Sequence, residues 1–232
     1  MSRRDLKEAA FLANIDLPRM KLVLHTWGNA SQIDREAGEI AIKPSGISYR
    51  DMRLDDIVVV DIEGHVIEGS LNPSSDLMTH LALYKALERI GGIVHTHSTY
   101  ATIWAQAKRE IPCIGTTHAD TFYGAVPVTR DLTDDEIMTE YELNTGKVIA
   151  ERFASLDALH IPGALVAGHG PFTWGPTAEV AVYNATVLEE IARMALHTNA
   201  LSPTGLSPVS QTLLDKHFLR KHGENAYYGQ KT

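Results

Sequence analysis

The feature that most constrains the fold is a helical segment that passes into a strand through a tight joint. Apolar residues recur at helical spacing over residues 76–90, and a buried strand pattern follows at 93–97. Gly91 and Gly92 end the predicted helix just before that strand. We therefore expect a chain in which helices and strands alternate and pack on one another.

A β-hairpin is predicted nearer the N-terminus. Strand patterns cover 38–42 and the apolar run at 56–62, and Glu63-Gly64 turns the chain into a partner strand at 65–68. Further helices are expected at 3–16, where Pro18 ends the helix, and at 98–107, 177–200 and 209–221. Residues 113–117 are a strand or loop, 164–167 a strand, Pro203 and Pro208 mark a loop, and 223–232 form a polar tail. Hairpin and helix–strand units together predict a sheet covered on both faces by helices.

Length, charge and cysteine content narrow the classes of function. The chain has 232 residues, 44% of them hydrophobic, which suits one globular domain over residues 1–232. Its formal net charge of -8 argues against a general nucleic-acid or anionic-membrane binder, because such surfaces gather Lys and Arg. The single Cys113 cannot form an intrachain disulfide, and no stretch approaches the roughly 20 apolar residues that span a bilayer. We expect a cytoplasmic protein.

The first candidate site is His95-Thr96-His97, at the end of a predicted buried strand. Residues i and i+2 of a strand project from the same face, so both imidazoles can face one ion. His169 follows another apolar strand, and Asp76 begins the helix that leads to His95. Three imidazoles and a carboxylate suit zinc or a similar divalent ion, with one position left for substrate or water. From spacing alone, two unrelated surface histidines remain an equal alternative.

Three small corners rich in Gly, Ser and Pro form the second candidate site. They lie at residues 28–29, 44–46 and 73–75. Ser74 and Ser75 precede a predicted helix, whose first-turn N–H groups and positive dipole end bind phosphate without net positive charge. This suits an acidic chain with a phosphorylated substrate. Ordinary turn chemistry and N-capping explain such corners equally well.

Ordered motifs along nearly the whole chain resemble the class II aldolase family and, within it, the L-ribulose-5-phosphate 4-epimerases. They are Thr-Trp-Gly-Asn at 26–29, Ile-Lys-Pro-Ser-Gly at 42–46, Pro-Ser-Ser-Asp at 73–76, Gly-Gly-Ile-Val-His-Thr-His at 91–97, Gly-Thr-Thr-His-Ala-Asp at 115–120, His-Gly-Pro-Phe at 169–172, Lys-His-Phe-Leu-Arg-Lys-His-Gly at 216–223 and Ala-Tyr-Tyr-Gly-Gln at 226–230. The resemblance implies a three-layer α/β/α fold with a central mixed, largely antiparallel sheet. It also implies a divalent metal, foremost Zn²⁺, and a homotetramer whose active sites lie between subunits.

The resemblance further implies roles for single residues. The metal ligands would be His95, His97, His169 and Asp76. The sugar phosphate would be held by Gly28, Asn29, Ser45, Gly46, Ser74 and Ser75, with Lys43 beside them. The acid/base pair would be Asp120 and Tyr228. In the family this pair comes from a neighbouring subunit, so the C-terminal tail is expected to dock at a subunit interface.

The implied reaction converts L-ribulose 5-phosphate to D-xylulose 5-phosphate. Because C4 has no adjacent carbonyl, the similar enzymes break C3–C4 in a retro-aldol step, through a metal-stabilised enediolate, and re-form the bond on the other face of the aldehyde. An aldolase that releases the two fragments is the alternative, although aldolases characteristically carry Glu where this chain has Asp76. A non-catalytic metal-binding protein fits poorly, because structural zinc sites are usually closed by four strong ligands.

Several polar residues keep open roles. Thr116, Glu142 and His217 match positions near the family's site, where they would orient the acid/base pair or serve as structural residues. Thr121 stands where the family commonly has an aromatic residue beside the acid. His80 is interpreted as an ordinary histidine with no part in the site.

Overall fold

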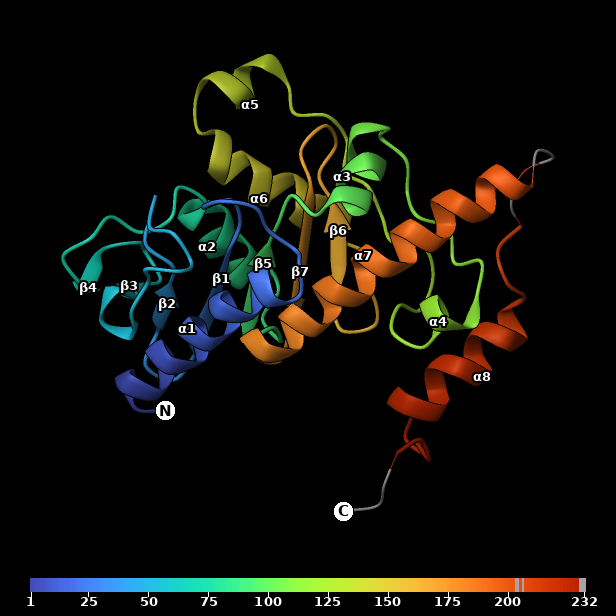
Figure 1. The fold of residues 1–232 in the computed structure, drawn as a ribbon, viewed down its shortest axis with the longest axis horizontal. Helices are drawn as coiled ribbons and strands as arrows, with labels where there is room; N and C mark the ends of the chain where they lie inside the picture. The colour runs from blue at the N-terminus through green and yellow to red at the C-terminus, as the bar shows by residue number, and fades with distance from the viewer. Residues whose placement is uncertain (203–204, 206, 230–232) are drawn as a thin grey trace.

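A central sheet organises the computed structural model, which describes residues 1–202, 205 and 207–229. Within these residues the sheet has seven strands in the order β4-β3-β2-β1-β5-β7-β6 (Figure 1). The strands are β1 (Asn29–Asp34), β2 (Glu39–Ile42), β3 (Val58–Asp61), β4 (Val66–Glu68), β5 (Gly92–His95), β6 (Gly163–Leu165) and β7 (Pro171–Gly175). Every neighbouring pair is antiparallel, and a single parallel bridge joins Val128 to Leu165. The expected, largely antiparallel sheet is confirmed.

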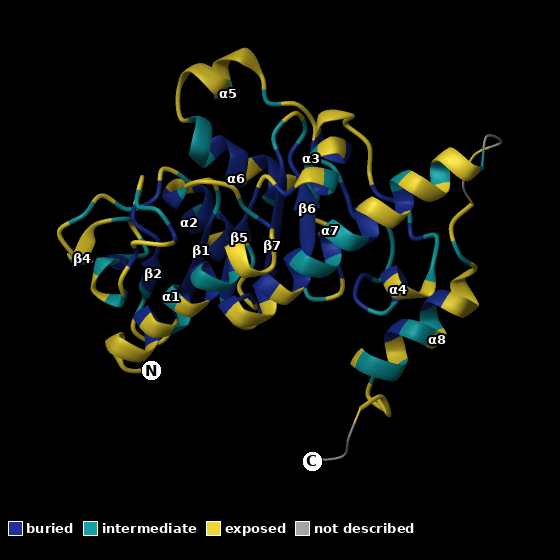
Figure 2. Ribbon diagram, in the orientation of Figure 1, coloured by how far each residue is buried: buried dark blue, intermediate teal, exposed yellow. Residues whose placement is uncertain are grey.

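Helices cover both faces of this sheet. They are α1 (Arg3–Arg19), α2 (Leu77–Ala86), α3 (Thr99–Gln106), α4 (Thr116–Ala119), α5 (Asp134–Met138), α6 (Tyr141–Arg152), α7 (Ala178–Leu201) and α8 (Gln211–His222), with a 3-10 turn η1 (Leu54–Asp56). Because side chains alternate along a strand, β1 sends Ala30 to one core and Ile33 to the other. Helix α1 and the first half of α7 pack on the Ala30 side, and α2, α3 and α6 pack on the Ile33 side. Figure 2 shows the central strands of this sheet as buried, whereas the edge strand β4 is largely exposed.

The glycine pair before β5 serves close packing as well as helix termination. A Cβ atom on Gly91 would lie 2.0 Å from the carbonyl oxygen of Pro176, and one on Gly92 would lie 2.2 Å from the backbone nitrogen of Ala178. The backbone therefore passes too close to the start of α7 for any larger residue. This approach anchors β5, the strand that carries His95.

The predicted hairpin is confirmed as β3 and β4, and the helix–strand unit as α2 and β5. Helix α2 ends earlier than expected, at Ala86, and α1 continues through Pro18 to Arg19 because a proline in the last turn removes only one hydrogen-bond donor. The segment at 113–117 contains no strand, since α4 begins at Thr116. The structure describes the predicted tail only to Gly229, so Gln230 lies outside the described residues. Pro203, in the predicted loop, also lies outside them.

Two central strands and the helices α4, α5 and α6 have no counterpart among the predicted elements. The strand β1 is buried along its whole length although it contains Asn, Ser, Gln and Asp, so the expected alternation of apolar and polar residues is absent. The strand β7 begins with Pro171 and ends with Gly175, both of which normally mark turns. A capping box formed by Thr133 and Glu136 begins α5, whereas the N-cap of α6, Glu140, makes no side-chain capping hydrogen bond.

Within the described residues, no helix combines the length and apolar character needed to cross a bilayer.

Candidate active site

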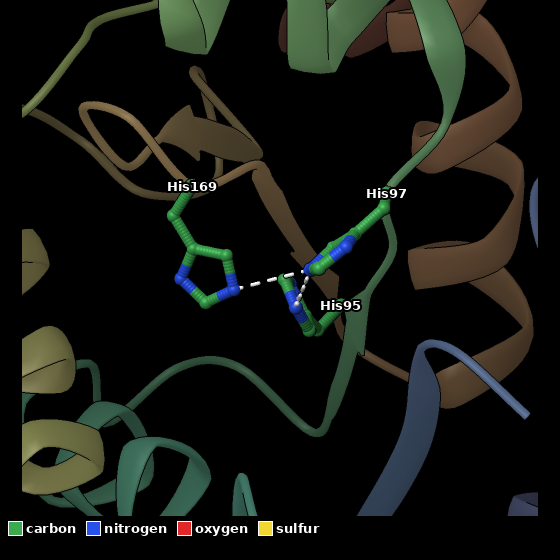
Figure 3. A group of neighbouring side chains, drawn as sticks. All are labelled: His95, His97 and His169. Atoms are coloured by element: carbon green, nitrogen blue, oxygen red, sulfur yellow. Dashed lines mark hydrogen bonds between the residues drawn. The ribbon is translucent and has the colours of Figure 1, made fainter.

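Three histidines meet at one end of the sheet (Figure 3). His95 is the last residue of β5, His97 follows two residues later, and His169 lies in the turn between β6 and β7. The Nε2 atom of His97 lies 3.1 Å from Nε2 of His95 and 3.1 Å from Nε2 of His169. The three ligand nitrogens thus converge within 4.8 Å of one another. Two unrelated surface histidines, the alternative that the spacing left open, would not converge in this way.

Hydrogen bonds on the far side of two rings orient these nitrogens. The Nδ1–H of His95 donates to the carbonyl oxygen of Pro171 over 3.0 Å, which leaves the Nε2 lone pair facing the cluster. The Nδ1 of His169 lies 3.3 Å from the hydroxyl of Tyr141 on α6. The ring of His95 also stacks on Phe172, with centroids 4.1 Å apart. Packing and hydrogen bonding therefore hold the ligand atoms in place.

The electrostatics of the cluster favour neutral imidazoles. Burial lowers the pKa of His95 and of His97, although the charge of Asp76 opposes this effect. Burial, together with the neighbouring His95 and His97, lowers the pKa of His169 to about 3. Because a metal binds the unprotonated ring, the ligands are ready for an ion at neutral pH.

Asp76, the N-cap residue of α2, lines the same cavity as the histidines, although the close cluster of ligand atoms comprises only the three imidazoles. Its Oδ2 accepts a hydrogen bond of 2.6 Å from Nδ2 of Asn29. Burial alone would raise the pKa of Asp76, but His95, His80 and the Asn29 hydrogen bond hold that pKa below its ordinary value. Two ligands about 2.0–2.1 Å from a tetrahedral ion lie roughly 3.3 Å apart, close to the separations between the Nε2 atoms here. The residues present therefore fit a divalent metal.

One cavity of about 650 Å³ brings the predicted metal and substrate residues together. It is lined by Thr26, Trp27, Gly28, Asn29, Lys43, Pro44, Ser45, Gly46, Ser74, Ser75, Asp76, His95, His97, Tyr141, Glu142 and His169. All eleven residues predicted to bind the metal or the sugar phosphate are among them. Gly28 has φ +75°, and a Cβ atom there would lie 2.7 Å from the carbonyl oxygen of His95. Only glycine fits this corner beside the metal site.

The two serine corners lie next to each other on the cavity wall. An antiparallel bridge joins Pro44 to Pro73, and the backbone N–H of Ser74 donates to the carbonyl oxygen of Lys43 over 2.9 Å. The pairing brings Ser45 and Ser74 to the same cavity. Because the backbone N–H groups of Ser45 and Ser74 are already used in this pairing, the two serine hydroxyls are the groups that can donate to an anion here.

Lys43 supplies the cation of this corner. Its side chain is buried, its Nζ donates to the carbonyl oxygen of Pro44 over 3.2 Å, and it lies 4.9 Å from the centre of the Tyr49 ring. Burial lowers the pKa of Lys43 to about 8. An anion in the cavity would favour the protonated amine, so binding a phosphate and charging Lys43 are coupled.

The predicted acid/base pair lies elsewhere in the chain. Asp120 follows α4 and accepts hydrogen bonds from Nδ1 of His217 at 3.0 Å and from Nη2 of Arg220 at 2.8 Å, and it pairs with Lys221 Nζ at 3.4 Å. Burial would raise the pKa of Asp120, but His217 and Arg220 lower it. The Tyr228 ring lies over the same Arg220 and Lys221 and is 62% exposed. The structure thus brings the two residues to one basic patch on α8, outside the histidine cavity.

The residues with open roles divide between these two places. Glu142 lines the histidine cavity, whereas His217 binds Asp120 and Thr116 begins α4. Thr121 is buried beside Asp120. Tyr141, the first residue of α6, is the cavity residue that sequence reasoning missed, because the nearby Thr133 capping box belongs to the preceding helix α5.

Comparisons with known proteins identify the family. The class II aldolase and adducin N-terminal domain matches residues 9–196. The chain is 58% identical over 226 residues to L-ribulose-5-phosphate 4-epimerase UlaF of Salmonella paratyphi A, a match that covers 97% of this chain and 99% of that one. Among solved structures, an L-fuculose 1-phosphate aldolase superposes with a TM-score of 0.78 at 28% identity, covering 94% of this chain and 96% of that one. An L-fuculose 1-phosphate aldolase from Glaciozyma antarctica PI12 has the same fold, with a TM-score of 0.77 at 23% identity and coverage of 97% and 84%. The chain therefore belongs to the class II aldolase family.

Proposed function

We propose that this chain catalyses the 4-epimerisation of L-ribulose 5-phosphate to D-xylulose 5-phosphate, with Zn²⁺ as its divalent ion. The observation that carries the proposal is the single cavity in which a three-histidine cluster faces serine and lysine corners suited to a phosphate. The 58% identity with an enzyme named as this epimerase narrows the class from sugar-phosphate aldolases and epimerases to this reaction. Asp76, in place of the Glu expected in an aldolase, supports the same choice.

The metal ion would be held by His95, His97 and His169, with Asp76 as a further ligand. When bound, such an ion supplies Lewis-acid stabilisation of the charge that develops on the substrate oxygens. The protein must then keep the released aldehyde in place while it turns. Ser45, Ser74 and Lys43 would do so by holding its phosphate, since they line the same cavity as the histidines.

Proton transfer at the C4 oxygen needs one group on each face of the aldehyde. When C3–C4 breaks, the C4 hydroxyl gives up its proton as the aldehyde forms. When C3–C4 re-forms on the opposite face, the new C4 alkoxide takes up a proton. We assign these two transfers to Asp120 and Tyr228, a carboxylate and a phenol suited to general acid and base catalysis.

This assignment requires a neighbouring subunit. Asp120 and Tyr228 lie on the α8 patch and do not line the cavity of their own chain. We therefore infer a closed homo-oligomer, a tetramer, in which the patch and C-terminal tail of one subunit complete the site of the next. The patch is accessible for such docking, because the Tyr228 ring is 62% exposed. We infer one domain over residues 1–232 and a reducing cytoplasmic setting, which the lone buried Cys113 suits.

Product analysis tests the reaction. Metal-loaded protein is incubated with L-ribulose 5-phosphate, and products are identified by chromatography and mass measurement against standards. The epimerase produces D-xylulose 5-phosphate as the main product. Sustained release of glycolaldehyde phosphate and dihydroxyacetone without D-xylulose 5-phosphate would instead assign the chain to the aldolases.

A further inference from the structure

Tyr49 contacts two separate parts of the cavity wall from behind. Its hydroxyl oxygen lies 2.7 Å from the carbonyl oxygen of Gly28 and 2.8 Å from that of Trp27, so the hydroxyl hydrogen is shared between the two carbonyls. The face of its ring lies 4.9 Å from Nζ of Lys43. Tyr49 is 7% exposed and does not itself line the cavity. The proposed reaction assigns it no role.

These contacts join two corners of the cavity that the sheet does not join. The hydrogen-bond ladder between β1 and β2 stops at the pair of Ser31 and Ile42, so this pairing does not reach the corners at 28–29 and 44–46. The hydroxyl of Tyr49 holds the first corner, and its ring lies against the lysine beside the second. One side chain therefore spans the gap.

Local structure fixes Tyr49 in this position. It lies in a turn after the second corner, in which the N–H groups of Asp51 and Met52 donate to the carbonyl oxygen of Ser48. The Oγ atom of Ser48 also donates to the Asp51 carboxylate over 2.7 Å. The Tyr49 ring belongs to the buried apolar cluster on the α1 side of the sheet. Because its loop and the core both hold it, Tyr49 can serve as a fixed point for the two corners.

The hydroxyl contact acts on the metal end of the cavity. Gly28 has a left-handed backbone conformation, and a Cβ atom there would lie 2.7 Å from the carbonyl oxygen of His95. The glycine backbone therefore passes directly beside the strand that carries a metal-site histidine. Gly28 and Asn29 both line the cavity. Holding the Gly28 carbonyl thus fixes the corner that faces the sugar part of the substrate.

The ring contact acts on the phosphate end. Lys43 is 2% exposed, and within the described residues its ammonium donates only to the carbonyl oxygen of Pro44 and pairs with no carboxylate. A buried cation without an anionic partner is costly unless another group compensates for its lost hydration. The electron-rich face of an aromatic ring attracts a cation, most strongly where water is excluded. Tyr49 therefore stabilises the ammonium and helps to fix its position in the absence of an anion.

We propose that Tyr49 is a positioning residue for sugar-phosphate binding, which holds the Gly28 corner with its hydroxyl and the Lys43 ammonium with its ring. The metal end and the phosphate end of the cavity are then kept at a fixed separation. A substrate that binds at both ends depends on this separation, whereas a free phosphate ion depends only on the Lys43 end. The inference rests on the proposed function, and Tyr49 acts through its neighbours without touching the substrate.

The test separates the two contacts in the full-length, metal-loaded protein. Tyr49→Phe removes the hydroxyl and keeps the ring, so it should raise KM for L-ribulose 5-phosphate by about 3-fold to 10-fold, with a smaller change in kcat. Its affinity for inorganic phosphate, measured by calorimetry, should be unchanged. Tyr49→Leu removes the ring as well and should weaken inorganic phosphate binding by about 3-fold to 30-fold.

Zn²⁺ affinity is the readout that separates positioning of the substrate from general damage to the cavity. It is determined by competition with a chromophoric chelator and should stay at the wild-type level in both Tyr49 variants, because other contacts hold the imidazoles. The matched control is Tyr84→Phe. It deletes the hydroxyl of another buried tyrosine, which lies 2.8 Å from Oγ of Ser31 and does not line the cavity. This control should leave KM, phosphate affinity and Zn²⁺ affinity unchanged.

A folded Tyr49→Phe protein with wild-type KM, or a folded Tyr49→Leu protein with wild-type phosphate affinity, overturns the proposal. A fall in Zn²⁺ affinity as large as the rise in KM also overturns it, because general loosening of the cavity would move both. Circular dichroism checks folding, and if one Tyr49 variant does not fold, the other decides by its own measurement.

Lys43→Met separates failure of this inference from failure of the proposed function. It should weaken inorganic phosphate binding more than any other variant. Retention of phosphate binding in Lys43→Met rejects the phosphate site itself, whereas loss there with retention in Tyr49→Leu rejects only the role of Tyr49. If the wild-type protein does not turn over L-ribulose 5-phosphate, the proposed function fails, and the phosphate affinities of wild type, Lys43→Met and Tyr49→Leu still decide on the ring contact.

Discussion

The histidine cavity and the α8 patch place polar groups in opposite settings. The cavity ligands lie at the ends of central strands, and His95 is 2% exposed with its outer nitrogen bound to a backbone carbonyl. The patch lies on a peripheral helix at the opposite end of the molecule from β4 (Figure 1), where the ring of Tyr228 is 62% exposed. The first region is organised by its own chain. In the proposed function, the second would gain a catalytic setting only at an interface with another subunit.

This difference separates two requirements of the proposed reaction. Ligands for an ion must keep fixed mutual distances, which a sheet supplies through its hydrogen-bond ladder. Acid/base groups must approach the substrate from two sides, and a neighbouring subunit can supply a side that the metal-binding chain does not cover. A separation of this kind predicts that damage to the cavity and damage to the patch can be told apart by experiment.

The largest effect is expected from the cavity. His97→Asn should remove the metal and lower activity by on the order of 10³-fold or more, because Lewis-acid stabilisation contributes several kcal/mol. The fold should persist, since the ring lies at a strand end outside the main core. Metal analysis, activity and circular dichroism on the purified variant check this, and full activity with unchanged metal content would remove His97 from the site.

A substitution in the α8 patch should lower activity and leave the metal content of the protein unchanged. Tyr228→Phe is expected to lower activity by about 10²-fold to 10⁴-fold, the range of a general acid or base, while metal content stays at the wild-type level. Its matched control is Tyr227→Phe, the adjacent tyrosine, which is 61% exposed and lies over Lys216 instead of Arg220. Loss of metal in Tyr228→Phe would contradict the separation of the two regions.

Mixing the two inactive variants tests whether the regions come from different subunits. His97→Asn and Tyr228→Phe proteins, dissociated and reassembled together, should regain part of the activity, because some interfaces join intact histidines to an intact tyrosine. Native mass measurement confirms that mixed oligomers form. Mixed oligomers without recovered activity would mean that Tyr228 serves the metal of its own subunit.

The sequence predicted the cavity better than the sheet that builds it. His95 and His97 were recognisable because a two-residue spacing at the end of an apolar strand has a direct geometric meaning. The strand β1, which carries Asn29 at the cavity, could not be recognised from the sequence. Its buried polar residues form hydrogen bonds with partners that are distant in sequence. Asn14, for example, pairs with the backbone of Ala30, and Gln32 accepts a hydrogen bond from the N–H of Ala178. Local sequence patterns do not reveal contacts between residues that are distant in sequence.

The spacing of the sequence also could not predict where the two residues of the proposed acid/base pair lie. Asp120 and Tyr228 are far apart along the chain, and the patch arises because α8 folds back on α4. Arg220 joins the two, since it donates to Asp120 and lies under the Tyr228 ring. The family resemblance named both residues, but only tertiary packing brings them together.

A smaller effect is expected from the buried cation of the cavity. Lys43→Met should raise KM for the sugar phosphate by about 10-fold or more with a lesser change in kcat, because a charged contact to phosphate is removed. The same variant should be more stable than wild type at pH 7. In the wild-type protein the folded-state pKa of Lys43, about 8, lies below the ordinary lysine value of 10.5, so keeping the buried amine protonated costs free energy.

The sign of this stability effect depends on pH. The cost is fully present below pH 8 and disappears as pH rises toward 10.5, because the unfolded chain binds more protons over that interval. We expect Lys43→Met to gain about 2 kcal/mol at pH 7, less than the full shift implies since the amine borders the cavity, and to gain less at pH 10. Urea unfolding at both pH values measures it, and a variant less stable than wild type at pH 7 contradicts it.

The smallest effect is expected at Tyr141, the cavity residue that the sequence did not reveal. Its hydroxyl lies 3.3 Å from Nδ1 of His169, a long hydrogen bond to a single ligand, whereas His95 is held by a backbone carbonyl and a stacked ring. Tyr141→Phe should therefore weaken Zn²⁺ binding by only a few-fold, below the about 10-fold lower end typical of shorter supports. Chelator competition measures the change, with Tyr183→Phe on α7, which does not line the histidine cavity, as the control. If Tyr141→Phe loses metal as completely as His97→Asn, the phenol is a principal support of His169, and the cavity depends on α6 as much as on its strands.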